Sequence, residues 1–256
     1  MTQQSPDMSK VAGGWLVPAS EVPVILGCKA PSATFSLPSH ARLVRHFMDT
    51  RSADAIISMA KLAPSLAPVS IQGLTEVTEA TTGSRRTTMW SPELADELHR
   101  LFRHAAFSKS LLCEDTYPTD WWQHGTKRSW KWVGVSPMLR FMRYAKGGQH
   151  FCHYDAGFIY PDPSYRTLMS FVLYLSTNSS GATRIIEDNQ QSLPVWERNH
   201  GDWSRPVQDS EVLAESLPVK GSVLIFPHRV PHDVQPYDGA EGDRIIIRGD
   251  LIYHAS

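Results

Sequence analysis

The chain has 256 residues, 41% of them hydrophobic, and its 25 lysines and arginines balance 26 aspartates and glutamates. This balance, with a pI near 6.8, does not favour nucleic acid as a partner. The sequence contains no run of 18 apolar residues and its polar start lacks the apolar core of a secretory signal, so we expect no membrane association and no export. Three widely spaced cysteines favour reduced thiols and a cytoplasmic protein.

The first half of the chain predicts an arm and supporting helices. Residues 1–40 are rich in proline, serine and glycine, which is typical of an irregular or strand-bearing segment. Residues 39–63 have apolar side chains at roughly helical spacing and predict one or two helices. Residues 75–90 are polar and threonine-rich, which indicates a loop or strand. A helix is predicted directly after Ser91, whose hydroxyl can cap its first turn.

The second half predicts a β-rich domain. Six short runs of β-branched and aromatic residues are separated by turn residues, with no helical pattern between them. They are "MLRFMRY", "HFCHYD", "TLMSFVLYLS", "ATRIIE", "SVLIFP" and "DRIIIRGDLIYH". This arrangement favours an antiparallel barrel or sandwich. Residues 187–217 interrupt it with a long polar segment, which we interpret as a lid, with a disordered insertion as the alternative.

A candidate metal site lies in the run "FCHYD". Residues i and i+2 of a strand point to the same face, so His153 and Asp155 project together and Tyr154 points away. A third ligand is available from His228 or His232 in "FPHRVPHDV". Two histidines and one carboxylate leave coordination positions open, and this set suits ferrous iron better than tetrahedral zinc.

An arginine on the last predicted strand is a candidate anchor for an anionic chelator. Open coordination positions accept a chelating anion, and a guanidinium binds the far carboxylate of such a molecule through two hydrogen bonds. Arg244 and Arg248 are four residues apart in "DRIIIRGD" and share one strand face. Either of them can serve, so the sequence leaves the choice open.

In order, these motifs resemble the prolyl-4-hydroxylase-like branch of the Fe(II)/2-oxoglutarate dioxygenases. The family pattern is Y-x-x-G-x-x-(F/Y)-x-x-H-x-D, a strand ending in Y-L, G-x-T, and H-x-V-x-P followed by a basic residue. The matching residues are Tyr144, Gly147, Phe151, His153, Asp155, Tyr174, Leu175, Gly181, Thr183, His232, Val234 and Pro236. Two departures are Ser180, where the family usually has glycine, and the 12-residue interval between His232 and Arg244, slightly longer than expected.

The resemblance implies a single catalytic domain across residues 1–256. A double-stranded β-helix, or jelly roll, is expected over residues 135–254, with residues 1–134 forming the N-terminal arm and its supporting helices. By similarity, the ligands of Fe(II) are His153, Asp155 and His232. The co-substrate 2-oxoglutarate is expected to meet Arg244, with Arg248 as the alternative, and to contact Tyr174 and Tyr144. Molecular oxygen is the second co-substrate.

The resemblance implies hydroxylation of an unactivated C–H bond, with release of succinate. We expect a small-molecule substrate such as an amino acid, with a prolyl or other residue of a protein as the alternative. A non-catalytic cupin-like module and a nucleic-acid demethylase are further alternatives. Candidate substrate contacts are Arg166, Trp121, Trp122 and Trp196, although packing and surface roles suit these residues as well. The sequence does not indicate an oligomeric state.

Overall fold

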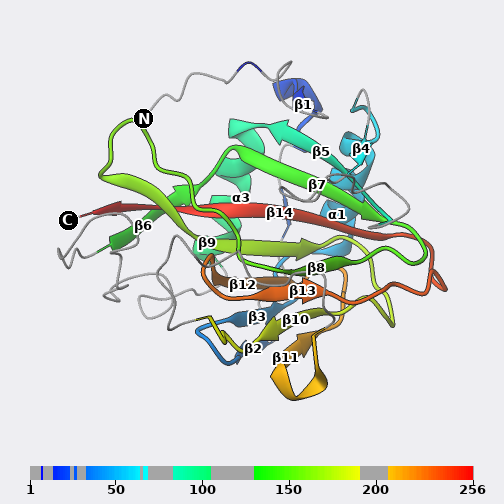
Figure 1. Cartoon of the computed structure of the whole chain (residues 1–256). Coiled ribbons are helices and arrows are strands. Elements are labelled where there is room, and N and C mark those ends of the chain that lie inside the picture. The colour runs from blue at the N-terminus through cyan, green and yellow to red at the C-terminus, as the bar shows by residue number, and fades with distance from the viewer. Residues whose placement is uncertain are drawn as a thin grey trace.

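The structure is a computed structural model that describes residues 7, 14–23, 26–27, 33–63, 66–68, 83–104, 130–190 and 207–255. Two β-sheets and two longer helices make up this part of the chain (Figure 1). The helices are α1 (Thr50–Ala60) and α3 (Pro92–His104), and short 3-10 helices span Ala19–Glu21 and Asp209–Glu211. No helix within these residues is both long and apolar enough to cross a membrane.

The larger sheet contains ten strands. Eight of them follow the order β1-β5-β7-β14-β9-β12-β3-β2, while β4 pairs with β5 and β6 pairs with β14. Their bounds are β1 (Gly14–Leu16), β2 (Ala33–Ser36), β3 (Arg42–Arg45), β4 (Ala67–Pro68), β5 (Ser84–Trp90), β6 (Trp130–Val135), β7 (Met138–Tyr144), β9 (Tyr165–Tyr174), β12 (Val223–Pro227) and β14 (Arg244–Ala255). Nearly all pairings are antiparallel, as the six predicted runs suggested.

The smaller sheet has the order β11-β10-β13-β8. Its strands are β8 (His150–His153), β10 (Thr183–Ile186), β11 (Val212–Ser216) and β13 (His232–Val234). It faces the larger sheet in Figure 1, and one apolar cluster joins the two, since Ile185 and Val234 pack with Val172 and Ile246. This two-sheet arrangement is the predicted jelly roll, and the fold class is confirmed.

Alternation along the strands gives the larger sheet two different faces. In β9, Phe171 and Leu173 belong to the cluster that contains the helices, whereas Val172 and Tyr174 belong to the cluster between the sheets. The Phe102 ring of α3 packs edge-on against Phe171, with centroids 5.3 Å apart. The helices therefore buttress the outer face, and the inner face is left for the site.

The structure changes two of the predicted elements. In the segment 39–63, residues Arg42–Arg45 form β3 and only Thr50–Ala60 are helical, because Asp49 caps the helix by accepting from Ser52 N at 2.7 Å. The segment 187–217 is not one continuous lid, since Val212–Ser216 pair with β10 as a strand. Its middle, residues 191–206, lies outside the described residues.

Replacing Gly221 with alanine is expected to destabilise the fold. Gly221 has φ of +80°, and an added Cβ would lie 2.2 Å from the backbone oxygen of Met48, which cannot move without shifting the chain. Left-handed strain and overpacking together predict a loss of about 2 kcal/mol or more in the free energy of unfolding. Urea denaturation measures this loss.

Gly242 offers the matched control for that measurement. It also has φ of +80°, but nothing lies within 4 Å of the position that an added Cβ would occupy. Gly242→Ala therefore tests the backbone strain alone and should cost about 1 kcal/mol. Equal losses for the two variants would contradict a steric role for the contact between Gly221 and Met48.

Candidate active site

The two sheets bring the three predicted metal ligands together. His153 ends β8 and is paired in register with His232, the first residue of β13. Asp155 follows two residues later, where its amide donates to the carbonyl oxygen of His228 at 3.0 Å. One donor atom from each of the three side chains lies within 4.8 Å of the other two. Asp155 Oδ1 is 3.9 Å from His153 Nε2, and its Oδ2 is 3.7 Å from His232 Nε2.

Backbone hydrogen bonds orient both imidazoles. His153 Nδ1 lies 2.7 Å from the carbonyl oxygen of Phe151, and His232 Nδ1 lies 2.9 Å from that of Val230. A carbonyl only accepts, so each Nδ1 must donate and each Nε2 keeps its lone pair. Such partners fix the tautomer and the ring orientation of metal-binding histidines. Both free lone pairs belong to the nitrogens that lie close to Asp155.

The ionisation states of the three groups suit a metal. Burial lowers the pKa of His232 to about 3 and also lowers the pKa of His153, so both rings are neutral near pH 7. Burial, the largest single effect, would raise the pKa of Asp155, but the charges of Arg248 and of the neighbouring histidines together outweigh burial and hold that pKa well below the usual range. Two neutral imidazoles and one carboxylate are the forms that bind Fe(II).

His228, the other histidine considered as a ligand, lies beside Asp155 and is connected to it through Ser170, but its ring does not converge with the three donors. It is buried, and its Nδ1 lies 2.9 Å from Ser170 Oγ. Burial lowers its pKa to about 4. It is not among the residues whose donor atoms converge with Asp155. The family motif H-x-V-x-P matches His232 and not His228, and the geometry of the site agrees with that match.

A second polar pocket surrounds Arg244, a fully buried residue. Its guanidinium lies 4.6 Å from the Tyr144 ring centroid and 5.8 Å from that of Tyr174. Its Nη2 donates to Thr183 Oγ1 at 2.9 Å, whereas Nε and Nη1 have no hydrogen-bond partner among the residues that the structure describes. A buried guanidinium with two such nitrogens is suited to an anion with two oxygens, as the far carboxylate of 2-oxoglutarate is.

Thr183 is a residue of this pocket to which the sequence alone assigned no role. Its hydroxyl oxygen also accepts from Tyr174 Oη at 3.1 Å, so it links the tyrosine to Arg244. Gly181 has φ of +70°, and a Cβ there would lie 3.2 Å from Arg244 Cδ. The G-x-T motif was the available signal, since its glycine leaves space for the arginine and its threonine positions it.

Arg248, the alternative anchor for the co-substrate, already pairs with two carboxylates of the protein. Its Nη2 lies 2.9 Å from Asp155 Oδ1, 3.1 Å from Asp250 Oδ1 and 3.1 Å from Ser170 Oγ. Ser170 also donates a short hydrogen bond to the other oxygen of Asp155. Arg248 and Ser170 thus hold the Asp155 carboxylate, and this placement favours Arg244 for the co-substrate.

Of the four candidate substrate contacts, Arg166 lies within the described residues. Arg166 is buried, and its guanidinium lies 4.3 Å from the Trp130 ring, which belongs to the cluster on the helix-bearing face of the larger sheet. Arg166 lies on this face because the register of β9 with β14 shifts between Leu251 and Ile252 and pairs Arg166 with Tyr253, and its role as a substrate contact stays a prediction. The other three candidates, Trp121, Trp122 and Trp196, lie outside the described residues.

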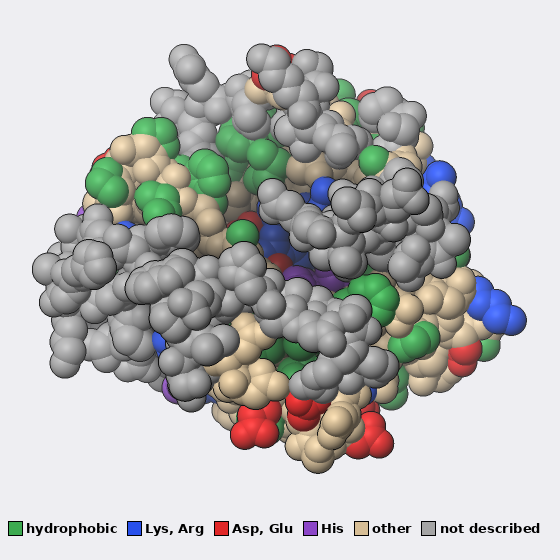
Figure 2. Space-filling model, viewed as in Figure 1, with side chains coloured by type: hydrophobic (Ala, Val, Ile, Leu, Met, Phe, Trp, Pro, Cys, Tyr) green, Lys and Arg blue, Asp and Glu red, His purple; other side chains and the backbone are tan. Residues whose placement is uncertain are grey.

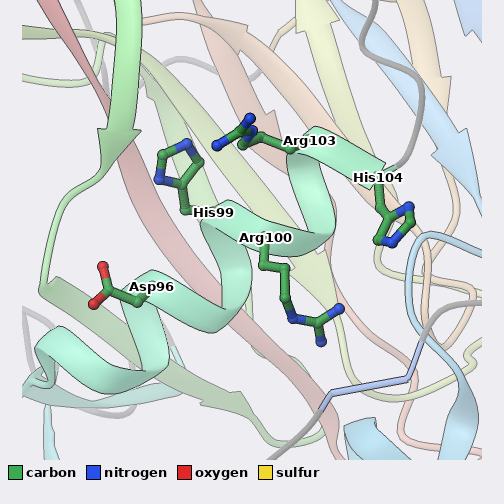
Figure 3. Close-up of a pocket in the computed structure, with 5 residues that line it drawn as sticks. All are labelled: Asp96, His99, Arg100, Arg103 and His104. Carbon is green, nitrogen blue, oxygen red and sulfur yellow. The ribbon is translucent and has the colours of Figure 1, made fainter.

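The molecular surface is hollowed beside the site. In Figure 2, histidine, basic and acidic side chains are visible together at the bottom of a hollow between the surrounding segments. Another pocket is lined, as far as the described residues go, by side chains of α3: Asp96, His99, Arg100, Arg103 and His104 (Figure 3). Because α3 packs on the outer face of the larger sheet, this pocket is not part of the metal site.

Comparison with known proteins agrees with the motif. The family model of the 2OG-Fe(II) oxygenase superfamily matches residues 139–249, a range that includes the three metal-site residues and both arginines of β14. No curated protein matches the sequence. The similarity to solved structures is low in identity but covers most of the chain.

Three of these structures illustrate the likeness. The viral collagen prolyl hydroxylase of Paramecium Bursaria Chlorella virus-1, in a 2-oxoglutarate complex, is 16% identical, with 85% of this chain and 97% of that chain covered and a TM-score of 0.47. The Trichoplax adhaerens prolyl hydroxylase, solved with a hypoxia inducible factor peptide, is 13% identical, with 84% of each chain covered and a TM-score of 0.50. HygX from Streptomyces hygroscopicus, with nickel and 2-oxoglutarate bound, is 13% identical, with 84% and 83% covered and a TM-score of 0.45.

The fold and the site together define a jelly-roll protein with a two-histidine, one-carboxylate candidate metal centre. Residues 139–249 match the model of the 2OG-Fe(II) oxygenase superfamily, which confirms the predicted oxygenase class, cofactor and co-substrates. The residue assignments within the site stay predictions.

Proposed function

We propose that the protein hydroxylates an unactivated C–H bond of a small molecule, with His153, Asp155 and His232 as the ligands of Fe(II). The observation that carries this proposal is the convergence of the three donors in the same jelly roll as Arg244. Two nitrogens of that buried arginine find no hydrogen-bond partner among the described residues. Both features fit the groups that this superfamily uses. A metal with open positions and an anion with a distal carboxylate would satisfy them together.

Each residue has a stated task in this proposal. Iron and 2-oxoglutarate supply the oxidising chemistry when bound, with succinate as the co-product. Arg244 binds the far carboxylate of the co-substrate, and Thr183 and Tyr174 hold the arginine in place. The Phe226 ring packs on His232, with centroids 4.4 Å apart, and helps exclude water. The ring of Tyr144 stacks on the Arg244 guanidinium.

A protein hydroxylase is the second candidate. Phe158 and Ile159 are 56% and 42% exposed, and they follow Asp155 by three and four residues. An exposed apolar pair so close to the metal residues in sequence suits contact with an extended peptide. The small molecule is favoured by the basic side chains inside the jelly roll, because charged groups at that depth suit a ligand that enters completely.

The whole chain is proposed to act as one catalytic domain. Helices α1 and α3 share their apolar cluster with strands of the larger sheet, so the predicted supporting region and the jelly roll have a common core. A cytoplasmic location remains a prediction from the cysteine pattern. The oligomeric state is left open.

Two measurements test this proposal. Anaerobic addition of Fe(II) and 2-oxoglutarate should give a weak visible charge-transfer band, and its absence would contradict the proposed site. Succinate release is then measured across amino acids, other small metabolites and proline-bearing peptides. Turnover stimulated only by peptides would favour the protein hydroxylase, and tight, salt-sensitive binding of DNA or RNA would instead support a nucleic-acid substrate.

A further inference from the structure

We propose that Arg86, assisted by Arg140, binds an anionic group of the substrate beside the metal site, so that the substrate carries a carboxylate. This inference rests on the proposed small-molecule oxygenase function and deepens it by naming a substrate class. Neither arginine was assigned a role above. Their position on the sheet, their charge balance and their partial exposure carry the inference.

Strand register places these arginines on the inner face of the larger sheet. Arg86 of β5 is paired with Met142 of β7, and Arg140 is paired with Arg248 of β14. Met142 belongs to the apolar cluster between the sheets, and Arg248 contacts Asp155. Because alternate residues of a strand share a face, Arg86 and Arg140 project to the side that holds the metal residues.

The charges on this face do not balance. Asp250 is shared, since it lies 3.2 Å from Arg140 Nη1 and 3.1 Å from Arg248 Nη2. Asp155 is the only other carboxylate that pairs with these arginines in the described part of the chain, and it is proposed to bind the metal. Within the described residues, Arg86 forms no ion pair. Three guanidinium groups therefore have one acidic partner that is free of the metal.

This excess of positive charge is partly removed from water. Burial lowers the pKa of Arg86, and the neighbouring charge of Arg248 lowers it further. An arginine stays protonated in proteins, so the repulsion persists until an anion offsets it. Arg86 is only half-buried. Figure 2 shows basic side chains beside histidine at the bottom of the hollow, where a molecule entering from solvent can reach them.

The co-substrate does not remove the need for this anion. Its far carboxylate is assigned to Arg244, which is paired in register with Tyr144, one inward-facing position along β7 from Met142, the partner of Arg86. The remaining positive charge lies on β5 and β7. A substrate carboxylate held there by a guanidinium gains charge-assisted hydrogen bonds, and these also orient the molecule beside the metal.

The test compares acids with their amides. The protein is loaded with Mn(II) and 2-oxoglutarate, which does not turn over, and is titrated calorimetrically with free amino acids, small monocarboxylates and the primary amide of each. We expect the acids to bind at least about tenfold more tightly than their amides. Arg86→Gln should weaken binding of the acids by about 10- to 100-fold and leave binding of the amides unchanged. Arg86→Lys should retain part of the preference for acids.

Arg143→Gln is the matched control. Arg143 is the neighbour of Met142 on β7, but its side chain is 54% exposed on the other face, where it pairs with Asp243. This variant should bind every probe as the wild type does. Unchanged affinity for 2-oxoglutarate in Arg86→Gln shows that the variant is folded and that the effect concerns the substrate.

Several results would overturn the inference. They are equal binding of acids and amides by the wild type, no binding by any acid, and no change in Arg86→Gln. Loss of 2-oxoglutarate affinity in Arg86→Gln would instead place Arg86 in the co-substrate site, and binding of phosphate monoesters in preference to carboxylates would contradict the stated class. Failure of the wild type to bind Mn(II) or 2-oxoglutarate is a separate result, because it would contradict the proposed metal and co-substrate site itself.

Discussion

Replacement of Asp155 with glycine is expected to abolish hydroxylation and to weaken Fe(II) binding by about 100-fold or more. The substitution removes the only anionic donor of the three and leaves the Arg248 guanidinium, now 2.9 Å from Asp155 Oδ1, facing the two imidazoles. A cation is repelled by that uncompensated charge. Metal affinity is measured by titration with Mn(II), and activity by succinate release.

Asp233→Asn provides the control for this variant. Asp233 lies on the same strand as His232, but its carboxylate turns away and pairs with Arg184, with Oδ1 2.9 Å from Arg184 Nε. Loss of that pair should affect stability and leave metal binding intact. Full hydroxylation by Asp155→Gly would show that the ligand assignment is wrong.

Arg244→Gln is expected to raise the dissociation constant for 2-oxoglutarate by about 10- to 100-fold while Fe(II) binding stays unchanged. The glutamine keeps polar atoms near Thr183 but removes the charge and the paired donors that face the carboxylate. Arg244→Lys restores the charge without the planar fork, so its affinity should lie between those of the other two proteins. Calorimetric titration with 2-oxoglutarate in the presence of Mn(II) gives the constants.

Arg248→Gln distinguishes the two arginines. Arg248 holds Asp155 and Asp250, so its loss should reduce Mn(II) affinity more than 2-oxoglutarate affinity. The opposite pattern, with Arg248→Gln losing the co-substrate and Arg244→Gln retaining it, would make Arg248 the anchor.

The candidate metal residues were predictable because strand alternation is a strong rule. His153 and Asp155 are two residues apart, so even a strand that ends at His153 leaves both on one side. The third ligand needed the ordered motif, since His228 and His232 are both buried and both follow an apolar strand. Only their contacts separate them, and these depend on the second sheet.

The sequence could not show whether Arg244 or Arg248 binds the co-substrate, because this too depends on contacts between distant strands. The two residues share a face of β14, and alternation cannot say which partner each one meets across the interior. Thr183 approaches Arg244 and Asp155 approaches Arg248 because strands distant in sequence lie opposite them. Those approaches are set by the packing of the sheets.

The structure also differs from the sequence-based predictions where strand pairing between distant segments determines the local structure. Arg42–Arg45 have apolar neighbours that also suit a helix, yet pairing with β12 makes them a strand. Arg86 was not predicted as a site residue, since its polar segment carries no motif of its own. Its inward direction follows from the register of β5 with β7, which no local pattern contains. The side of β9 on which Arg166 lies follows from a register shift between β9 and β14, which the local pattern does not reveal.

The position of β14 has a consequence for how related chains can change in length. The turn before it contains Gly239 and Gly242, both with positive φ, and lies outside the strands. A residue added or removed in that turn leaves the alternation of side chains within β14 unaltered. A single deletion between Arg244 and Arg248 would instead turn one of them toward the helices. Arg244 and Arg248 therefore keep a common face of β14 only when the number of residues between them changes by two.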